Sequence, residues 1–161
     1  MNDEIVLATE ADRGELLKLY KAQVGREYCA WTDGYPGDET ISFDLERDAL
    51  FVMKRDGRII AAISHEEDED VDKLDCWDPD LAPGGELARL CVSPELQNEG
   101  LARKMMERGM QALKERGYKS IHFLVNKYNV KAIRSYAVFG FNVVGECQMY
   151  EQDFLCYEKA L

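Results

Sequence analysis

The stretch Leu90-Cys91-Val92-Ser93-Pro94-Glu95-Leu96-Gln97-Asn98-Glu99-Gly100-Leu101-Ala102 decides the fold of this 161-residue chain. Its apolar start indicates the end of a strand, Ser93-Pro94 breaks that strand, and a helix is expected from Asn98. Gly100 and Ala102 are small, so a bulky anion can approach the first helical turn. Free N–H groups and the positive end of the helix dipole favour phosphate there. The stretch therefore predicts a strand–turn–helix unit that suits an anionic cofactor, although a plain structural turn has the same pattern.

The two common glycine motifs for phosphate do not occur in the chain. A dinucleotide-binding turn needs three spaced glycines, and a P-loop needs Gly-Lys followed by Ser or Thr. Hydride transfer and nucleotide hydrolysis therefore lose support.

Other elements follow from apolar spacing and turn residues on both sides of this stretch. The expected helices are 12–24, 39–49, 98–116 and 130–139, and the expected strands are 5–8, 50–54, 59–64, 86–92, 120–125, 141–149 and 153–158. The segment from Glu66 through Gly85 is expected to be loop. Its acidic block 66–70 is typical of a solvated loop, with an acidic mouth for a cationic substrate as the alternative.

The order of these elements predicts a mixed sheet. Strand 86–92, helix 98–116 and strand 120–125 imply a right-handed crossover between parallel neighbours, whereas the Asp56-Gly57 turn implies an antiparallel hairpin. We therefore expect one α/β (α+β) domain over residues 1–161, with a mostly antiparallel twisted sheet of about seven strands flanked by four helices.

Composition excludes several classes of protein. Apolar residues make up 46% of the chain and the formal net charge is −11, which argues against nonspecific binding to nucleic acid or to an anionic membrane. No apolar run is long enough to span a bilayer. The acidic start Met1-Asn2-Asp3-Glu4 lacks the features of a signal peptide, so a cytoplasmic location is expected.

The cysteines and histidines indicate neither a metal site nor a nucleophilic pair. The five cysteines, Cys29, Cys76, Cys91, Cys147 and Cys156, are widely spaced and contain no Cys-x-x-Cys pair, so reduced thiols and no metal are expected. His65 and His122 are the two histidines, and each is expected to be a packed or strand-end residue.

Two motifs resemble those of the GNAT superfamily of N-acetyltransferases. The first is Gln/Arg-x-x-Gly-x-Gly/Ala after a strand ending in Val-x-Pro, here 97–102 after Val92-Ser93-Pro94. The second is represented by Asn129, Ala132, Tyr136, Gly140 and Phe141. The order and spacing of the two motifs make the resemblance specific over residues 86–141, with the earlier elements matching in order.

The resemblance implies acetyl-coenzyme A as cosubstrate. The diphosphate is expected on the backbone of the 97–102 turn, pantetheine along the strand 86–92 where it splays from 120–125, and the cofactor arm near Asn129. The cofactor-binding residues so implied are Leu90, Cys91, Val92, Gln97, Asn98, Glu99, Gly100, Leu101, Ala102, Arg103, Asn129 and Tyr136. Because Glu99 is acidic, only its backbone is expected to contribute.

The implied reaction is direct attack of a primary amine on the thioester within a ternary complex. It needs a neutral amine, donors for the oxyanion and an acid for the leaving thiolate. Tyr136 matches the acid of the family, with an aromatic core residue as the alternative. Glu86 is expected to be the base, directly or through water, with an exposed strand carboxylate as the alternative. A backbone N–H near Cys91 or Val92 is expected to stabilise the oxyanion.

The acceptor is left open between a small-molecule and a peptide amine. By analogy with the family, Trp31, Tyr35 and the 144–152 region are expected to contact it. Two other functions compete with catalysis: a non-catalytic acyl-CoA sensor, and an acidic protein-interaction module with a merely structural Gly100 turn. A monomer or a homodimer is expected.

Overall fold

The computed structural model describes residues 2–27 and 29–161. The chain forms two compact units, which we name unit 1, comprising Met1–Glu66 and Ala88–Gly109, and unit 2, comprising Glu67–Leu87 and Met110–Leu161. Strand β4 and helix α4 contribute residues to both units. The prediction of one functional domain over residues 1–161 stays a prediction.

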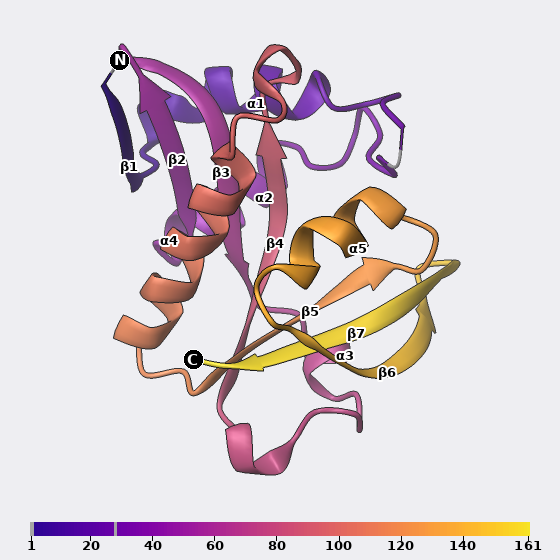
Figure 1. The fold of residues 1–161 in the computed structure, drawn as a ribbon. Helices are drawn as coiled ribbons and strands as arrows, with labels where there is room; N and C mark the ends of the chain where they lie inside the picture. Colours follow the sequence, from indigo (N-terminus) through magenta and orange to yellow (C-terminus); the bar gives the residue numbers. More distant parts are fainter. Residues whose placement is uncertain (1, 28) are drawn as a thin grey trace. The chain divides into compact units, whose positions relative to one another are not determined.

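Unit 1 contains the N-terminal elements and the end of the fold-deciding strand. They are β1 (Asp3–Leu7), α1 (Arg13–Lys21), α2 (Asp38–Glu46), β2 (Leu50–Arg55), β3 (Arg58–Glu66), the end of β4 (Gly84–Val92) and the start of α4 (Leu101–Glu115). Unit 2 contains the start of β4, α3 (Glu69–Asp72), the end of α4, β5 (Ser120–Asn126), α5 (Val130–Ala137), β6 (Asn142–Met149) and β7 (Gln152–Ala160). Figure 1 labels these elements on the ribbon.

The strands follow the order β1-β2-β3-β4-β5-β7-β6. Antiparallel pairing joins β1 to β2 and β2 to β3 in unit 1, and β5 to β7 and β7 to β6 in unit 2. The start of β4 pairs in parallel with β5, from Gly84 opposite Ser120 to Glu86 opposite His122. The predicted mixed, mostly antiparallel seven-stranded sheet is therefore confirmed.

The core of unit 1 lies between its helices and strands. One face of α1 buries Leu16, Leu19 and Tyr20, whose spacing of three and four residues is that of an amphipathic helix. These side chains pack in one apolar cluster with Val52 of β2 and Cys91 of β4. Ser93, the residue after β4, donates its N–H to Ile60 O near the start of β3 at 2.8 Å. The strand that leads into the 93–102 turn is therefore held both by this bond and by the apolar core.

The core of unit 2 is an aromatic cluster on one face of β5 and β7. Phe123 lies 4.9 Å from the ring centres of both Tyr136 and Phe141 and 5.7 Å from that of Tyr157. Edge-to-face contacts of this kind add stabilisation beyond the burial of the rings. The cluster fixes α5 on its strand neighbours, because Tyr136 is the residue of α5 that contacts it.

Three predicted helix boundaries are wrong by three residues each, namely the start of the helix 98–116 and the ends of the helices 12–24 and 39–49, the last of which ends at Glu46. Helix α4 begins at Leu101 instead of Asn98, because Asn98 and Gly100 have φ of 65° and 78°, in the left-handed region. The helix expected over 12–24 ends at Lys21, and its start forms a 3₁₀ turn over Glu10–Asp12. Among the described residues, no helix combines the length and apolar character needed to cross a bilayer.

The segment expected to be loop contains α3 and a 3₁₀ turn over Pro79–Leu81. Within the acidic block, the Asp68 side chain caps α3 by accepting hydrogen bonds from Asp70 N and Val71 N. Side-chain capping of the first turn stabilises such a short helix. The prediction of a loop is therefore wrong for this part of the block, whereas the expected solvation is confirmed by the exposure of Glu69 and Asp70.

Candidate functional site

The turn before α4 is held by the side chain of Gln97. Its amide Nε2 donates to the main-chain oxygens of Val92 and Ser93, each at 3.0 Å. The Leu96 N–H closes the same turn on Ser93 O at 2.9 Å. The predicted cofactor residue Gln97 therefore shapes the turn with its side chain, so a ligand at this turn would meet the main chain.

The main-chain N–H groups at the start of α4 point out of the helix end. As in any α-helix, the N–H groups of its first turn, which begins at Leu101, have no acceptor within the helix. The left-handed φ of Asn98 and Gly100 turns the chain sharply ahead of the helix start. A methyl group added at Gly100 would meet nothing within 4 Å. This N-terminus therefore offers several donors, the helix dipole and open space to an anion.

Acidic and basic side chains beside this turn are paired with each other. The carboxylate of Glu99 lies 3.6 Å from Arg55 Nη1, and Arg103 Nε lies 3.3 Å from Glu107 Oε1. The Arg103–Glu107 pair is exposed and is worth little in stability, whereas the Arg55 side chain of the other pair keeps 14% of its surface. The Arg55 pair partly neutralises Glu99, the one acid inside the predicted phosphate turn.

The last two residues of β4 are buried. Cys91 and Val92 keep 5% and 7% of their surface, and Leu90 is half-buried. Burial raises the pKa of the Cys91 thiol far above its usual range. The thiol of Cys91 is therefore a poor nucleophile, in agreement with the expectation that no cysteine carries the chemistry.

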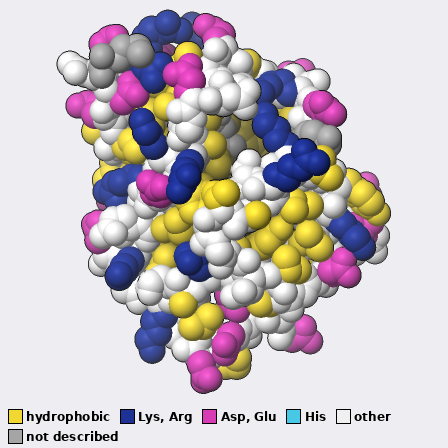
Figure 2. All heavy atoms as spheres, in the orientation of Figure 1, with side chains coloured by type: hydrophobic (Ala, Val, Ile, Leu, Met, Phe, Trp, Pro, Cys, Tyr) yellow, Lys and Arg dark blue, Asp and Glu magenta, His cyan; other side chains and the backbone are white. Residues whose placement is uncertain are grey.

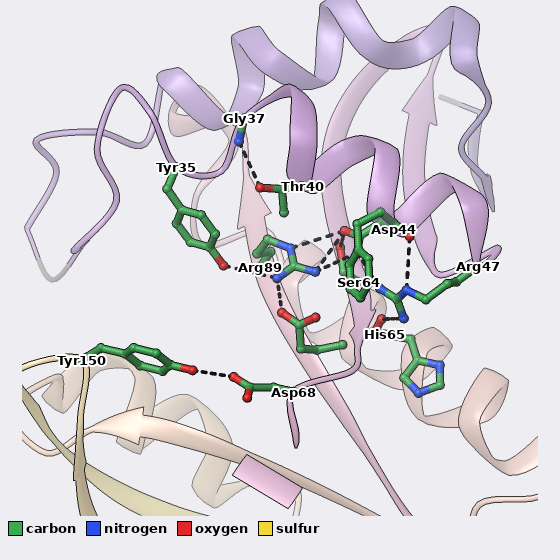
Figure 3. Close-up of polar contacts among 12 residues, drawn as sticks. Tyr35, Gly37, Thr40, Asp44, Arg47, Ser64, His65, Asp68, Arg89 and Tyr150 are labelled. Atoms are coloured by element: carbon green, nitrogen blue, oxygen red, sulfur yellow. Dashed lines mark hydrogen bonds and ion pairs between the residues drawn. The ribbon is translucent and has the colours of Figure 1, made fainter. Parts of the chain in front are cut away.

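A buried ion network in unit 1 was not predicted from the sequence (Figure 3). The Arg89 guanidinium binds both carboxylate oxygens of Asp44, with Nη2 at 2.8 and 3.0 Å, and its Nη1 contacts Glu66. The Asp44 carboxylate also accepts from Arg47 Nη2 and Ser64 Oγ, each at 2.7 Å. The Asp44 side chain is completely buried, and that of Arg89 keeps 3% of its surface.

Opposing effects act on the two charges of this network. Burial raises the pKa of the Asp44 carboxyl, against the charge of Arg89 and the hydrogen bond from Ser64. Burial lowers the pKa of Arg89, but the bond to Glu66 and the charge of Asp44 outweigh it and raise the pKa overall. The sequence carries one sign of this network, which is the position of Arg89 inside the apolar run of β4. A buried arginine needs an acid partner, so an arginine at such a position predicts one.

The two predicted acceptor residues of unit 1 lie in different surroundings. Trp31 is half-buried and packs edge-on against Tyr20 at 5.6 Å between ring centres, at the margin of the core. Tyr35 is 47% exposed, and its hydroxyl accepts a hydrogen bond from Arg89 Nη1 at 3.2 Å. Tyr35 is thus held by the buried network with its ring open to solvent, which suits a binding residue better than the packing of Trp31 does.

The predicted base, Glu86, lies on β4 within unit 2. Its exposed fraction is 8%, so the alternative of an exposed strand carboxylate is wrong. Glu86 stands opposite His122 in the parallel register of β4 and β5. Carboxylate or imidazole atoms of Asp72, Glu86 and His122 all lie within 4.8 Å of one another. His122 is therefore a packed strand histidine, as expected, but with two acids beside it.

The predicted acid, Tyr136, both packs in the aromatic cluster and keeps its proton. Burial raises its pKa to about 12, with a further contribution from Tyr157. The phenol is therefore protonated at neutral pH and can donate a proton when a stronger base is presented. Packing and proton donation, which the sequence left as alternatives, are compatible at this position.

The second predicted motif begins with a helix cap. The Asn129 side-chain oxygen accepts from Ala132 N at 3.0 Å, which fixes the start of α5. All residues of α5 are described and none is fully buried, Tyr136 being half-buried. Val130 at the start of the helix and Val138 just after its end are 46% and 64% exposed. Figure 2 shows hydrophobic side chains gathered over the region of α5. An apolar surface of this kind suits a ligand arm better than water.

The 144–152 region contributes one further polar group in unit 2, also drawn in Figure 3. The Tyr150 hydroxyl donates to Asp68 Oδ2 at 2.6 Å, and Tyr150 is 61% exposed. This hydrogen bond, with burial and the charge of Asp68, raises the pKa of Tyr150. The contact joins the β6–β7 turn to the capping residue of α3, and it leaves an acid and a phenol at the surface.

Residues 15–141 match the family model described as the acetyltransferase (GNAT) family. Solved structures with the same fold include a Salmonella typhimurium putative acetyltransferase, yncA, with its cofactor acetyl-CoA (19% identity, 100% and 95% of the two chains, TM-score 0.77). The fold is also similar to that of a Brucella melitensis ribosomal-protein-alanine N-acetyltransferase, with 22% identity, coverage of 98% and 99% of the two chains, and a TM-score of 0.74. It is similar as well to that of the Thermoplasma acidophilum paia N-acetyltransferase in complex with coenzyme A, with 18% identity, coverage of 100% of both chains, and a TM-score of 0.70. No curated protein sequence matches the chain.

Proposed function

The chain belongs to the acetyltransferase (GNAT) family, and on that premise we propose that it transfers the acetyl group of acetyl-CoA to a primary amine. The observation that carries the proposal is the start of α4 at Leu101, where the helix N–H groups follow Gly100, whose φ is 78° and beside which an added Cβ would meet nothing within 4 Å. Free amides at a helix start bind phosphate. Coenzyme A carries a diphosphate, and its thioester supplies the activated acetyl group.

Under this proposal, each proton has a donor or an acceptor within the chain. Glu86 accepts the proton that the amine nitrogen loses as it bonds to the acetyl carbon. A main-chain N–H at Cys91 or Val92 donates to the oxyanion. Tyr136 is protonated at neutral pH because burial raises its pKa to about 12, and it stabilises the leaving sulfur by donating a hydrogen bond as the carbon–sulfur bond breaks. The sulfur leaves as the thiolate, because a thiolate of pKa about 8.5 is a weaker base than the Tyr136 phenolate.

The acceptor we propose is cationic in its free form. The net charge is −11, and Tyr150 and Asp68 present a phenol and a carboxylate in the predicted acceptor region. An acidic surface raises the local concentration of an ammonium substrate. A small-molecule amine and a peptide amine both satisfy this requirement. A cytoplasmic location and a monomeric or homodimeric state stay predictions.

Release of free thiol from acetyl-CoA in the presence of an amine panel tests the proposal. We expect thiol release to depend on the amine and to be matched by an acetylated product in mass spectrometry. Thermal stabilisation by coenzyme A is measured in parallel, because a ligand at 100 times its dissociation constant adds about 2.7 kcal/mol. Stabilisation without turnover across the panel would favour the non-catalytic sensor, and no stabilisation would remove the cofactor site altogether.

A further inference from the structure

Buried acid and imidazole groups lie together on one face of unit 2. Glu86, His122 and Glu158 are neighbours across β4, β5 and β7 in the strand register. They keep 8%, 4% and 3% of their surface. Asp72 adds a third carboxylate from α3, with its Oδ1 at 2.8 Å from His122 Nε2. Burying several carboxylates is costly unless a cation or strong hydrogen bonds compensate them.

The carboxylates on the two sides of His122 make different contacts. On the β7 side, both Glu158 oxygens accept from Asp78 N, at 3.1 and 3.2 Å, so this carboxylate holds the loop before β4. On the other side, Asp72, Glu86 and His122 each offer one ligand atom, all within 4.8 Å of one another. From these three residues we propose that unit 2 binds one divalent transition-metal ion of the zinc class.

The distances suit such an ion with small movements. Zinc bonds to imidazole nitrogen and carboxylate oxygen are about 2.1 Å long, which separates two ligand atoms by about 3.4 Å in a tetrahedral site. Asp72 Oδ1 and His122 Nε2 are closer than this value, at 2.8 Å, and all three ligand atoms lie within 4.8 Å of one another. The Asp72 side chain is 51% exposed and can adjust, whereas the strand residues Glu86 and His122 are held by the sheet. One His and two carboxylates leave at least one coordination position open.

The imidazole is fixed in place before any ion arrives. Trp77 stacks on the His122 ring with centres 4.5 Å apart, and its Nε1 donates to Val71 O at 2.8 Å, next to Asp72. The ring also lies against Gly84, where an added Cβ would be 2.7 Å from His122 Nδ1. A ligand held this way loses little freedom on binding, as metal sites require.

The proposal goes beyond acetyl transfer but shares Glu86 with it, so binding is measured without turnover. Untagged, EDTA-treated protein is titrated with Zn²⁺ by calorimetry, and the Co²⁺ complex is examined by visible absorption. We expect one ion per chain. Asp72→Asn should weaken Zn²⁺ binding at least about 10-fold, whereas Asp70→Asn, on the same short helix, should change it less than about twofold.

Replacement of the histidine gives the second comparison. His122→Gln should abolish binding, and His65→Gln, at the other buried histidine, should not. If circular dichroism shows that His122→Gln does not fold, the Asp72→Asn variant still tests the metal site, because the Asp72 side chain is half-exposed. Any one of three results would overturn the proposal: wild-type protein that binds no Zn²⁺, an Asp72→Asn variant with unchanged affinity for Zn²⁺, or thiolate charge-transfer bands in the Co²⁺ complex. The last result would place the ion on cysteine thiols instead. A protein without acetyltransferase activity would leave this test intact.

Discussion

Replacing Gly100 by alanine tests the phosphate turn with little disturbance of the folded chain. Gly100 has φ of 78°, and an added Cβ would meet nothing within 4 Å. The cost to stability is therefore only that of a left-handed non-glycine residue, about 1–2 kcal/mol. For a chain of this length, that lowers Tm by about 2–8 °C.

The cost to cofactor binding should be larger, because the new methyl group would occupy the space of the diphosphate. Loss of one charge-assisted hydrogen bond costs about 1.5–3 kcal/mol, which raises the Kd for coenzyme A about 10- to 100-fold. Calorimetric titration of coenzyme A into Gly100→Ala and wild-type protein measures this difference.

The chain offers a matched control in the hairpin between β2 and β3. Gly57 has φ of 81°, and an added Cβ there would also meet nothing within 4 Å. Gly57→Ala should therefore lose the same stability and keep the wild-type Kd. Equal Kd values for Gly100→Ala and Gly57→Ala would refute the placement of the diphosphate at this turn.

Two further predictions concern Tyr136 and the buried ion network. Tyr136→Phe should lower kcat about 100-fold or more with little change in Tm. The control Tyr157→Phe removes a hydroxyl from the same aromatic cluster and should keep kcat within a few-fold of the wild-type value. Equal effects of the two variants in steady-state kinetics would leave Tyr136 as a core residue only. Asp44→Asn should lower the free energy of unfolding, measured in urea, by about 3–5 kcal/mol, because it leaves Arg89 and Arg47 without their buried carboxylate. The control Asp38→Asn breaks the exposed pair with Arg13 and should lower it by less than about 1 kcal/mol. Similar losses for the two aspartate variants would contradict the argument from burial.

The fold could be predicted because its signals are local. Apolar spacing, glycine stops and the Asp56-Gly57 turn each act within a few residues, and they place all seven strands and the four longer helices. The start of α4 was predicted three residues early because spacing does not reveal that Asn98 takes a left-handed φ. Helix α3 was missed because it is stabilised by the side chain of Asp68, and a run of acids is more often solvated.

Contacts between distant positions were beyond this kind of prediction. The Asp44–Arg89 pair joins residues 45 positions apart, and neither residue belongs to a motif. The sequence does carry a hint, because Arg89 interrupts an apolar strand. Its partner could not be chosen among 31 acids without the fold.

Glu86 shows how one buried residue can serve two proposals that constrain each other. As the base, it must be an ionised carboxylate with a lone pair available, and burial makes that state expensive unless a positive charge or donors lie nearby. Asp72 adds a second carboxylate within 4.8 Å, which makes an ionised Glu86 more costly still. An ion bound by the three residues would stabilise the Glu86 carboxylate, but it would draw electron density from it and make it a weaker base. Metal binding at Glu86 therefore opposes amine deprotonation, so the ion would inhibit acetyl transfer rather than assist it.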